Sequence, residues 1–172
     1  RERMLAVAEH YYAFDGISPI NGQNRALIAA LEKELVSHHI DLPIYWGNRN
    51  WHPLLPDTMA QMKSDGIKRA LAFLTSAYSS YSNCRQYREN IADAQESVGD
   101  GAPQIDKLRA FFNHPGFIET MTDRVRDALA QIPEERRTKA SLIYTAHSIP
   151  YAMAAGCAYE AQLQEAARLV SQ

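Results

Sequence analysis

Three shortages in this sequence each rule out a class of protein. The chain holds only two cysteines, Cys84 and Cys157, in 172 residues. This is too few for a disulfide scaffold, so we expect a reducing compartment and a cytoplasmic location. No apolar run approaches the roughly 20 residues that span a bilayer, so no transmembrane segment is predicted. The chain has eighteen basic and twenty acidic residues, so it lacks the excess of positive charge that is typical of nucleic-acid-binding proteins.

Several motifs of common catalytic and binding sites are missing as well. No G-x-G-x-x-G pattern and no Walker-type lysine loop occurs, which argues against a nucleotide cradle. Ser148 does not lie in a G-x-S-x-G nucleophile elbow. His52 and His114 both precede proline and are interpreted as turn residues.

Helical and extended patterns alternate along the chain and predict a single α/β domain over residues 1–172. The composition, 46% hydrophobic and 22% charged, suits a sizeable core. Apolar residues spaced by three and four predict helices at residues 1–12, 23–37, 55–63, 84–97, 116–131 and 159–171. Apolar and β-branched runs predict strands at residues 42–47, 69–75 and 142–145, with a short edge strand at 104–108. This order is typical of a Rossmann-like parallel sheet with helices on both faces.

His147 directly follows the predicted central strand, residues 142–145. Ligands of open α/β sheets lie outside the carboxyl ends of the strands, where the loops 48–52, 76–83 and 146–150 should meet. Among the side chains of the last loop, only imidazole changes charge near neutral pH. A histidine in this position is also often a hydrogen-bonded cap for the turn, and the residues alone leave both interpretations open.

Four segments in order carry a resemblance to one family. They are residues 11–20 (YYAFDGISPI), residues 51–53 with 62–67 (WHP and MKSDGI), residues 75–87 (TSAYSSYSNCRQY) and residues 145–150 (TAHSIP). They resemble the porphyrin-lip motif, the second block, the actinobacterial form of the third block, and the metal-site signature of ferrochelatases. The resemblance spans nearly the whole chain and implies a chelatase-like three-layer domain.

Ferrochelatases insert Fe²⁺ into a porphyrin during haem biosynthesis, so the resemblance implies a lyase with ferrous iron and a porphyrin as substrates. It places the catalytic, metal-facing histidine at His147 and porphyrin-contacting groups at Ser18, Tyr87 and Tyr11. A neutral imidazole can accept a pyrrole proton or ligate iron, and hydroxyls can donate to propionates. The family's metal-site glutamate lies in a second half-domain. We therefore expect this chain, which begins within a helix, to be the first half of a two-domain ferrochelatase, without that carboxylate.

The first block departs from the family at one position. The motif usually has two glycines before Ile/Val-Ser-Pro, whereas this chain has Asp15 and Gly16. If the first position requires a positive φ, Asp tolerates it better than most residues, so we expect a small effect.

Cys157 has two interpretations. Some bacterial members of the family hold a [2Fe–2S] cluster with four cysteines, one of them shortly after the histidine loop, and the resemblance places Cys157 there as an iron–sulfur ligand. Four thiolates are needed, so other ligands would lie outside this chain. The alternative is a small buried thiol.

The sequence leaves the substrate and the activity open. The actinobacterial form of the third block favours coproporphyrin III, with protoporphyrin IX as the alternative. A cobalt chelatase on the same fold lacks support from that block. The alternative that is not an enzyme is a non-catalytic module that binds porphyrin or haem. Proteins of the haem pathway are the expected partners beyond the porphyrin itself.

Overall fold

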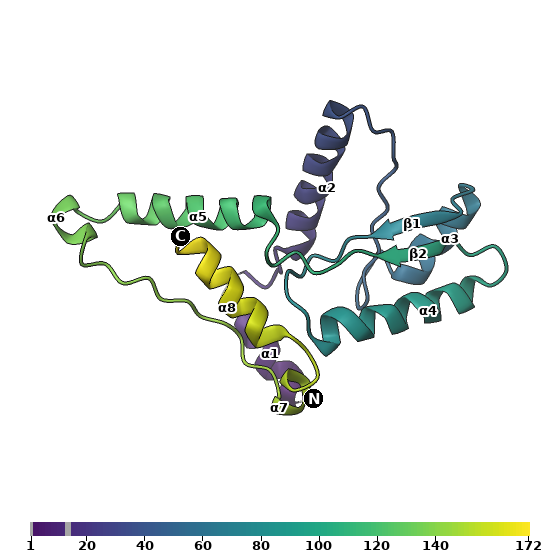
Figure 1. Cartoon of the computed structure of the whole chain (residues 1–172). Coiled ribbons are helices and arrows are strands. Elements are labelled where there is room, and N and C mark those ends of the chain that lie inside the picture. The colour runs from purple at the N-terminus through teal and green to yellow at the C-terminus, as the bar shows by residue number, and fades with distance from the viewer. Residues whose placement is uncertain (1, 13–14) are drawn as a thin grey trace. The chain divides into compact units, whose positions relative to one another are not determined.

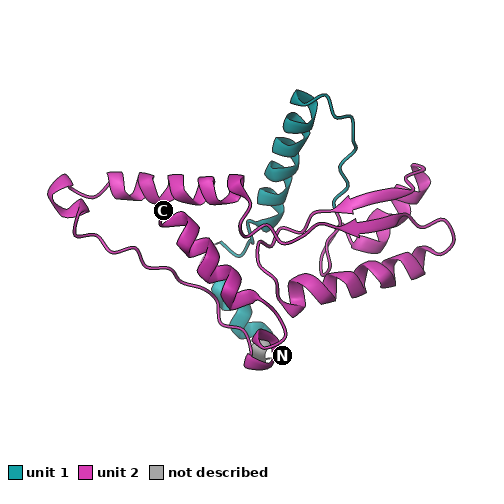
Figure 2. Cartoon of the chain, viewed as in Figure 1, with its two compact units in different colours: residues 1–46 teal, residues 47–172 magenta. Residues whose placement is uncertain are grey.

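The computed structural model describes residues 2–12 and 15–172, which form two compact units (Figure 2). Unit 1 is Arg1–Trp46 and unit 2 is Gly47–Gln172. Ala13 and Phe14, in the middle of the first family-like segment, lie outside the described residues. In the part of the chain that the structure describes, no helix has the length and apolarity needed to cross a membrane.

Unit 1 contains two helices, α1 (Glu2–Tyr12) and α2 (Ile20–Ser37), in agreement with the prediction (Figure 1). α2 begins three residues earlier than predicted. Pro19, with a φ of −73°, already has helical geometry, and its carbonyl accepts the N–H of Gln23 over 2.9 Å. Proline suits such a start because its fixed φ matches the helix and it has no N–H to leave unpaired.

A left-handed turn follows α1. The N–H of Gly16 donates to the carbonyl of Tyr11 over 2.8 Å, while Asp15 and Gly16 have φ values of 59° and 73°. This conformation closes a helix by satisfying one of its last carbonyls. Asp15 thus has the positive φ that the expectation assumed, while the small effect of the substitution stays a prediction.

Unit 2 contains the parallel sheet. Strand β1 (Arg69–Ala72) pairs with β2 (Gln104–Lys107), in a register that sets Arg69 opposite Gln104 and Ala72 opposite Lys107. The connection between them contains the π-helical turn η1 (Tyr81–Arg85) and α4 (Gln86–Val98), and α3 (Leu55–Ser64) precedes β1. Parallel strands need a crossover of this kind. The α/β class with a parallel sheet is therefore confirmed, and the predicted edge strand at 104–108 is one of its two strands.

A small core lies between this sheet and two helices. Met59 of α3 packs with Ile91 and Ala94 of α4, and Ala72 and Ile105 of the sheet pack against them. Met59 and Ala94 are each only 1% exposed. These contacts hold the middle of α4 and the end of β1 together, on either side of the connection that contains η1.

Two predicted strands do not form. Residues 42–47 and 142–145 form no regular element, and Leu142, Ile143 and Tyr144 are exposed by 49%, 80% and 45%. A strand is stabilised by the ladder it shares with a neighbour, and within the described residues neither segment pairs with a strand. The prediction of a buried central strand at 142–145 is therefore wrong for the described residues, because this apolar run pairs with no strand and stays exposed.

The second half of unit 2 is helical. α5 (Pro115–Ala130) and α8 (Tyr159–Val170) match the predicted helices and contact each other. Two short helices, α6 (Glu134–Arg137) and α7 (Tyr151–Ala154), were not predicted because single turns carry no periodicity. His114 caps α5 by accepting the N–H of Gly116 at Nδ1 over 3.2 Å, in agreement with its interpretation as a turn residue.

Candidate functional site

His147 lies in the irregular segment between α6 and α7, and its side chain is exposed. Its main-chain carbonyl accepts the hydroxyl of Tyr159, at the start of α8, over 3.1 Å. Pro150 then begins α7 as its N-cap residue. The main chain at His147 is thus anchored, and the imidazole is left accessible to a ligand.

The hydroxyl-rich loop 76–83 is held at several points. Gln162 of α8 accepts both the N–H and the hydroxyl of Ser79, over 2.7 and 2.9 Å. The side chain of Ser80 accepts the N–H of Asn83 and so caps η1. The side-chain amide of Asn83 donates to the carbonyl of Tyr78 over 3.1 Å. The polar residues of this loop therefore brace the loop itself and tie it to α8.

Tyr78 anchors the same loop to an aromatic cluster. Its ring meets those of Phe117 and Tyr159 edge-on, with centroids 6.4 and 6.2 Å apart. Phe117 continues the contacts to Phe111, and Phe111 stacks on Phe73 just after β1. Burial, together with the neighbouring Tyr159, raises the pKa of the Tyr78 hydroxyl above its ordinary value, so this hydroxyl stays protonated at neutral pH.

Tyr87, predicted to contact porphyrin, lies at the start of α4 next to Arg49. The Arg49 guanidinium carbon is 4.9 Å from the centre of the Tyr87 ring. Nη1 of Arg49 donates to the carbonyl of Ser82 over 3.2 Å, while its Nε is buried without a hydrogen-bond partner among the described residues. The ring contact and the bond to Ser82 therefore hold the guanidinium beside Tyr87.

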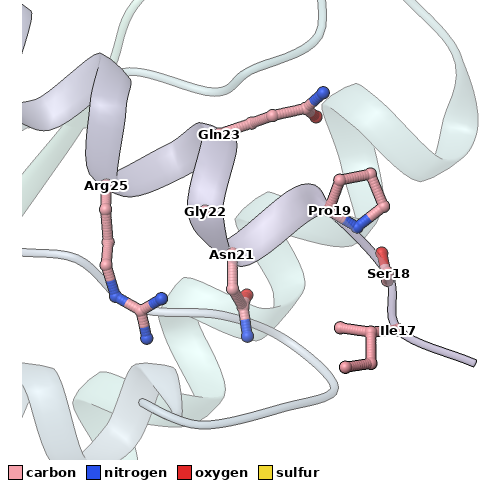
Figure 3. A pocket seen from close by; sticks show the side chains of 7 residues that line it. All are labelled: Ile17, Ser18, Pro19, Asn21, Gly22, Gln23 and Arg25. Carbon is pink, nitrogen blue, oxygen red and sulfur yellow. The ribbon is translucent and has the colours of Figure 1, made fainter. Parts of the chain in front are cut away.

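Ser18 lines a cleft of about 590 Å³ in unit 1 (Figure 3). Asn21 and Arg25, one turn apart on α2, extend to the same side of the helix in that view. The guanidinium carbon of Arg25 is 5.6 Å from the centre of the Trp46 ring. The sequence reasoning missed Arg25, because a single cation in a helical pattern looks like any solvated residue.

Tyr11 lines a second, mostly apolar hollow of about 440 Å³, formed by α1. Its ring is 44% exposed.

Tyr11 and Ser18 belong to unit 1, whereas Tyr87 and His147 belong to unit 2. Within unit 2, Tyr87 contacts Arg49, and His147 contacts Tyr159.

Cys157 follows α7, is half-buried, and lies 3.8 Å from the carbonyl of Ala154. Both cysteines are free thiols. Across residues 2–12 and 15–172, no group of three or more His, Cys, Asp and Glu side chains is placed to hold a metal. A metal at His147 would therefore need further ligands from elsewhere.

The comparisons with known proteins agree over the full length of the chain. The sequence model of the ferrochelatase family matches residues 1–172. The chain is 60% identical over 172 residues to a ferrochelatase of Rhodopirellula baltica, covering 99% of this chain and 48% of the relative. It is 50% identical over 184 residues to the coproporphyrin III ferrochelatase of Streptomyces coelicolor (99% and 49%) and 51% identical over 174 residues to that of Mycolicibacterium smegmatis (99% and 51%). The chain spans about half the length of the curated relatives it matches.

Proposed function

The chain belongs to the ferrochelatase family, and from this premise we propose that it is the first half-domain of a lyase that inserts Fe²⁺ into coproporphyrin III. The observation that carries the proposal is the match over residues 1–172, together with about 50% identity to relatives named coproporphyrin III ferrochelatase. The actinobacterial form of residues 75–87 points to the same substrate. Protoporphyrin IX is the competing substrate.

His147 is the proposed catalytic and metal-facing residue. Inserting a metal requires two pyrrole protons to leave, and an exposed neutral imidazole can accept one or ligate incoming iron. Fe²⁺ accepts imidazole and carboxylate ligands. Since the described residues bring no carboxylate cluster to His147, we propose that the partner acid comes from the second half-domain.

The porphyrin propionates are the proposed partners of the polar groups around Tyr87 and Ser18. Arg49 places a cation beside the ring of Tyr87, and the Tyr87 hydroxyl can donate to a carboxylate. In unit 1, Ser18 and Arg25 line one cleft and offer a hydroxyl and a cation. Tyr11 is proposed to contact the macrocycle with its exposed ring.

The test is an anaerobic insertion assay. The complete polypeptide and residues 1–172 alone are each mixed with Fe²⁺ and either coproporphyrin III or protoporphyrin IX, and metalloporphyrin absorbance is followed. Insertion by the complete polypeptide, faster with coproporphyrin III, supports the proposal. Equal or faster insertion with protoporphyrin IX would reassign the substrate. A shifted porphyrin band without any metalloporphyrin would instead favour a non-catalytic binding module.

Three finer features are also proposed. Cys157 is a candidate ligand of a [2Fe–2S] cluster, which iron and acid-labile sulfide analysis of the complete polypeptide would test. The low cysteine content agrees with a cytoplasmic location, which fractionation would test. Proteins of the haem pathway are candidate partners, since they handle the substrate and the product.

A further inference from the structure

Two side chains of α8 reach both loops of the candidate site in unit 2. The Tyr159 hydroxyl donates to the main-chain carbonyl of His147 over 3.1 Å. Gln162 accepts the N–H and the hydroxyl of Ser79 over 2.7 and 2.9 Å. Tyr159 and Gln162 are three residues apart, so they lie on the same face of the helix, about one turn apart.

The ring of Tyr159 adds a second link to the hydroxyl-rich loop. It meets the ring of Tyr78 edge-on at 6.2 Å and 86°. Tyr78 is the residue before Ser79, and its carbonyl accepts the side-chain amide of Asn83. One turn of α8 therefore supports two neighbouring positions of the 76–83 loop as well as the main chain of His147.

This support matters because the histidine segment has little other structure. Residues 139–150 form no helix and no ladder, and every side chain from Lys139 to Ser148 is exposed. Where a segment has few packed neighbours, single hydrogen bonds decide its position. Catalytic groups also lose efficiency when they are displaced by about 1 Å.

We propose that Tyr159 and Gln162 are positioning residues of the insertion reaction, because together they fix the main chain of His147 relative to the Tyr78–Ser79 loop. The inference rests on the proposed function. Both residues act through others: Tyr159 holds the carbonyl of the metal-facing histidine, and Gln162 holds the loop that the Tyr159 ring contacts.

The test compares variants of the complete polypeptide in the Fe²⁺ and coproporphyrin III assay. Tyr159→Phe removes one hydroxyl and keeps the ring, and Gln162→Leu removes the acceptor at similar volume. We expect kcat to fall about threefold to tenfold in each, the range of one neutral hydrogen bond. The Kd for the porphyrin should stay within about twofold, because no porphyrin-contacting group has changed.

Two substitutions of the same kind serve as controls. Tyr81→Phe removes a hydroxyl bonded to Glu89 over 3.1 Å, in a contact that involves neither α8 nor the histidine segment. Gln164→Leu removes an amide that pairs with Glu160 on the exposed side of α8. Both should keep the kcat of the wild type. Gln162→Glu keeps an acceptor for Ser79 and should restore most of the activity lost in Gln162→Leu.

The outcomes separate the two proposals. If the wild type inserts iron and the Tyr159 and Gln162 variants match their controls, the positioning roles are wrong and the proposed function stands. If porphyrin affinity falls in parallel with kcat, or Gln162→Glu fails to rescue, the two residues only stabilise the fold and the inference is overturned. If the wild type inserts no metal, the proposed function is wrong, and this inference, which depends on it, is wrong as well.

Discussion

The guanidinium of Arg49 lies over the ring of Tyr87, with 4.9 Å between the guanidinium carbon and the ring centre. The two residues come from different segments of unit 2, the loop before α3 and the first turn of α4. A cation held against an aromatic face is stabilised, and the second anchor of Arg49, the carbonyl of Ser82, fixes its direction. These two contacts hold the Arg49 guanidinium in one position against the Tyr87 ring, so the two side chains do not move independently at the surface.

The first prediction concerns this pair. Tyr87→Phe keeps the ring under Arg49 and removes only the hydroxyl, so it should weaken porphyrin binding while leaving the fold intact. A hydrogen bond to a charged group contributes about 1.5 to 3 kcal/mol, so Kd should rise roughly tenfold to a hundredfold. Fluorescence quenching by titrated porphyrin measures it.

The matched control is Tyr81→Phe, which removes a hydroxyl bonded to Glu89 over 3.1 Å on the exposed side of the same region. It should leave Kd unchanged. An unchanged Kd in Tyr87→Phe as well would remove Tyr87 from the porphyrin site.

His147→Ala in the complete polypeptide should abolish iron insertion. Porphyrin binding should survive within about tenfold, equivalent to 1.4 kcal/mol, because the proposed propionate partners are elsewhere. Insertion and binding are measured on the same preparation. His38→Ala, at the exposed C-terminal end of α2, is the control and should insert iron normally. Near-normal turnover in His147→Ala would refute the metal-facing assignment.

Lowering the pH should reduce the stability of unit 2 through protonation of Asp106. Nε of Arg69 donates to its carboxylate across the two-stranded sheet over 2.7 Å, and this bond holds the pKa of Asp106 below its ordinary value. A carboxyl with a lowered folded-state pKa stabilises the protein above its unfolded pKa, and this contribution is lost as pH falls through the folded pKa.

Asp106→Asn should therefore lose less stability than the wild type between about pH 6 and about pH 3. Urea unfolding midpoints at the two pH values measure the difference. Asp100→Asn, in the exposed turn after α4, should follow the wild type. A wild-type pH profile in Asp106→Asn would show that the cross-strand pair does not matter to stability.

Met59→Ala should destabilise unit 2 strongly. The side chain is 1% exposed and packs against Ile91 and Ala94, so its removal leaves a cavity and costs about 2 to 5 kcal/mol. Met121→Ala, at a 42% exposed position on α5, should cost much less. Urea denaturation compares them, and equal losses would show that the core lies elsewhere.

The sequence predicted the helices better than the strands, for a physical reason. The apolar spacing of Phe117, Met121 and Val125 is a property of α5 itself, and the helix forms where that spacing lies. A strand depends on a partner that the local sequence does not reveal. Residues 69–72 found one in β2, whereas residues 142–145, equally apolar, did not.

The candidate site, like the fold, could be predicted only in part. The position after a predicted strand singled out His147, and the resemblance to ferrochelatases added Tyr87 and Ser18; their roles stay predictions. The contacts that hold them could not be predicted, since Gln162 is 83 residues from Ser79 and looks like an ordinary surface residue of α8. Whether Cys157 ligates a cluster stays a prediction.

The π-helical turn Tyr81–Arg85 has a consequence for comparing this chain with its relatives. A π turn holds one residue more than an α turn. It therefore rotates the side chains of the hydroxyl-rich loop relative to those of α4, compared with a regular α turn. Removing any one residue between Tyr81 and Arg85 would let α4 wind back as regular α-helix through this region. Because Ile91 and Ala94 hold α4 in the core, the shift would fall on the residues before the turn, and a one-residue gap at this point of an alignment would mark a different placement of the loop 76–80 relative to Tyr87.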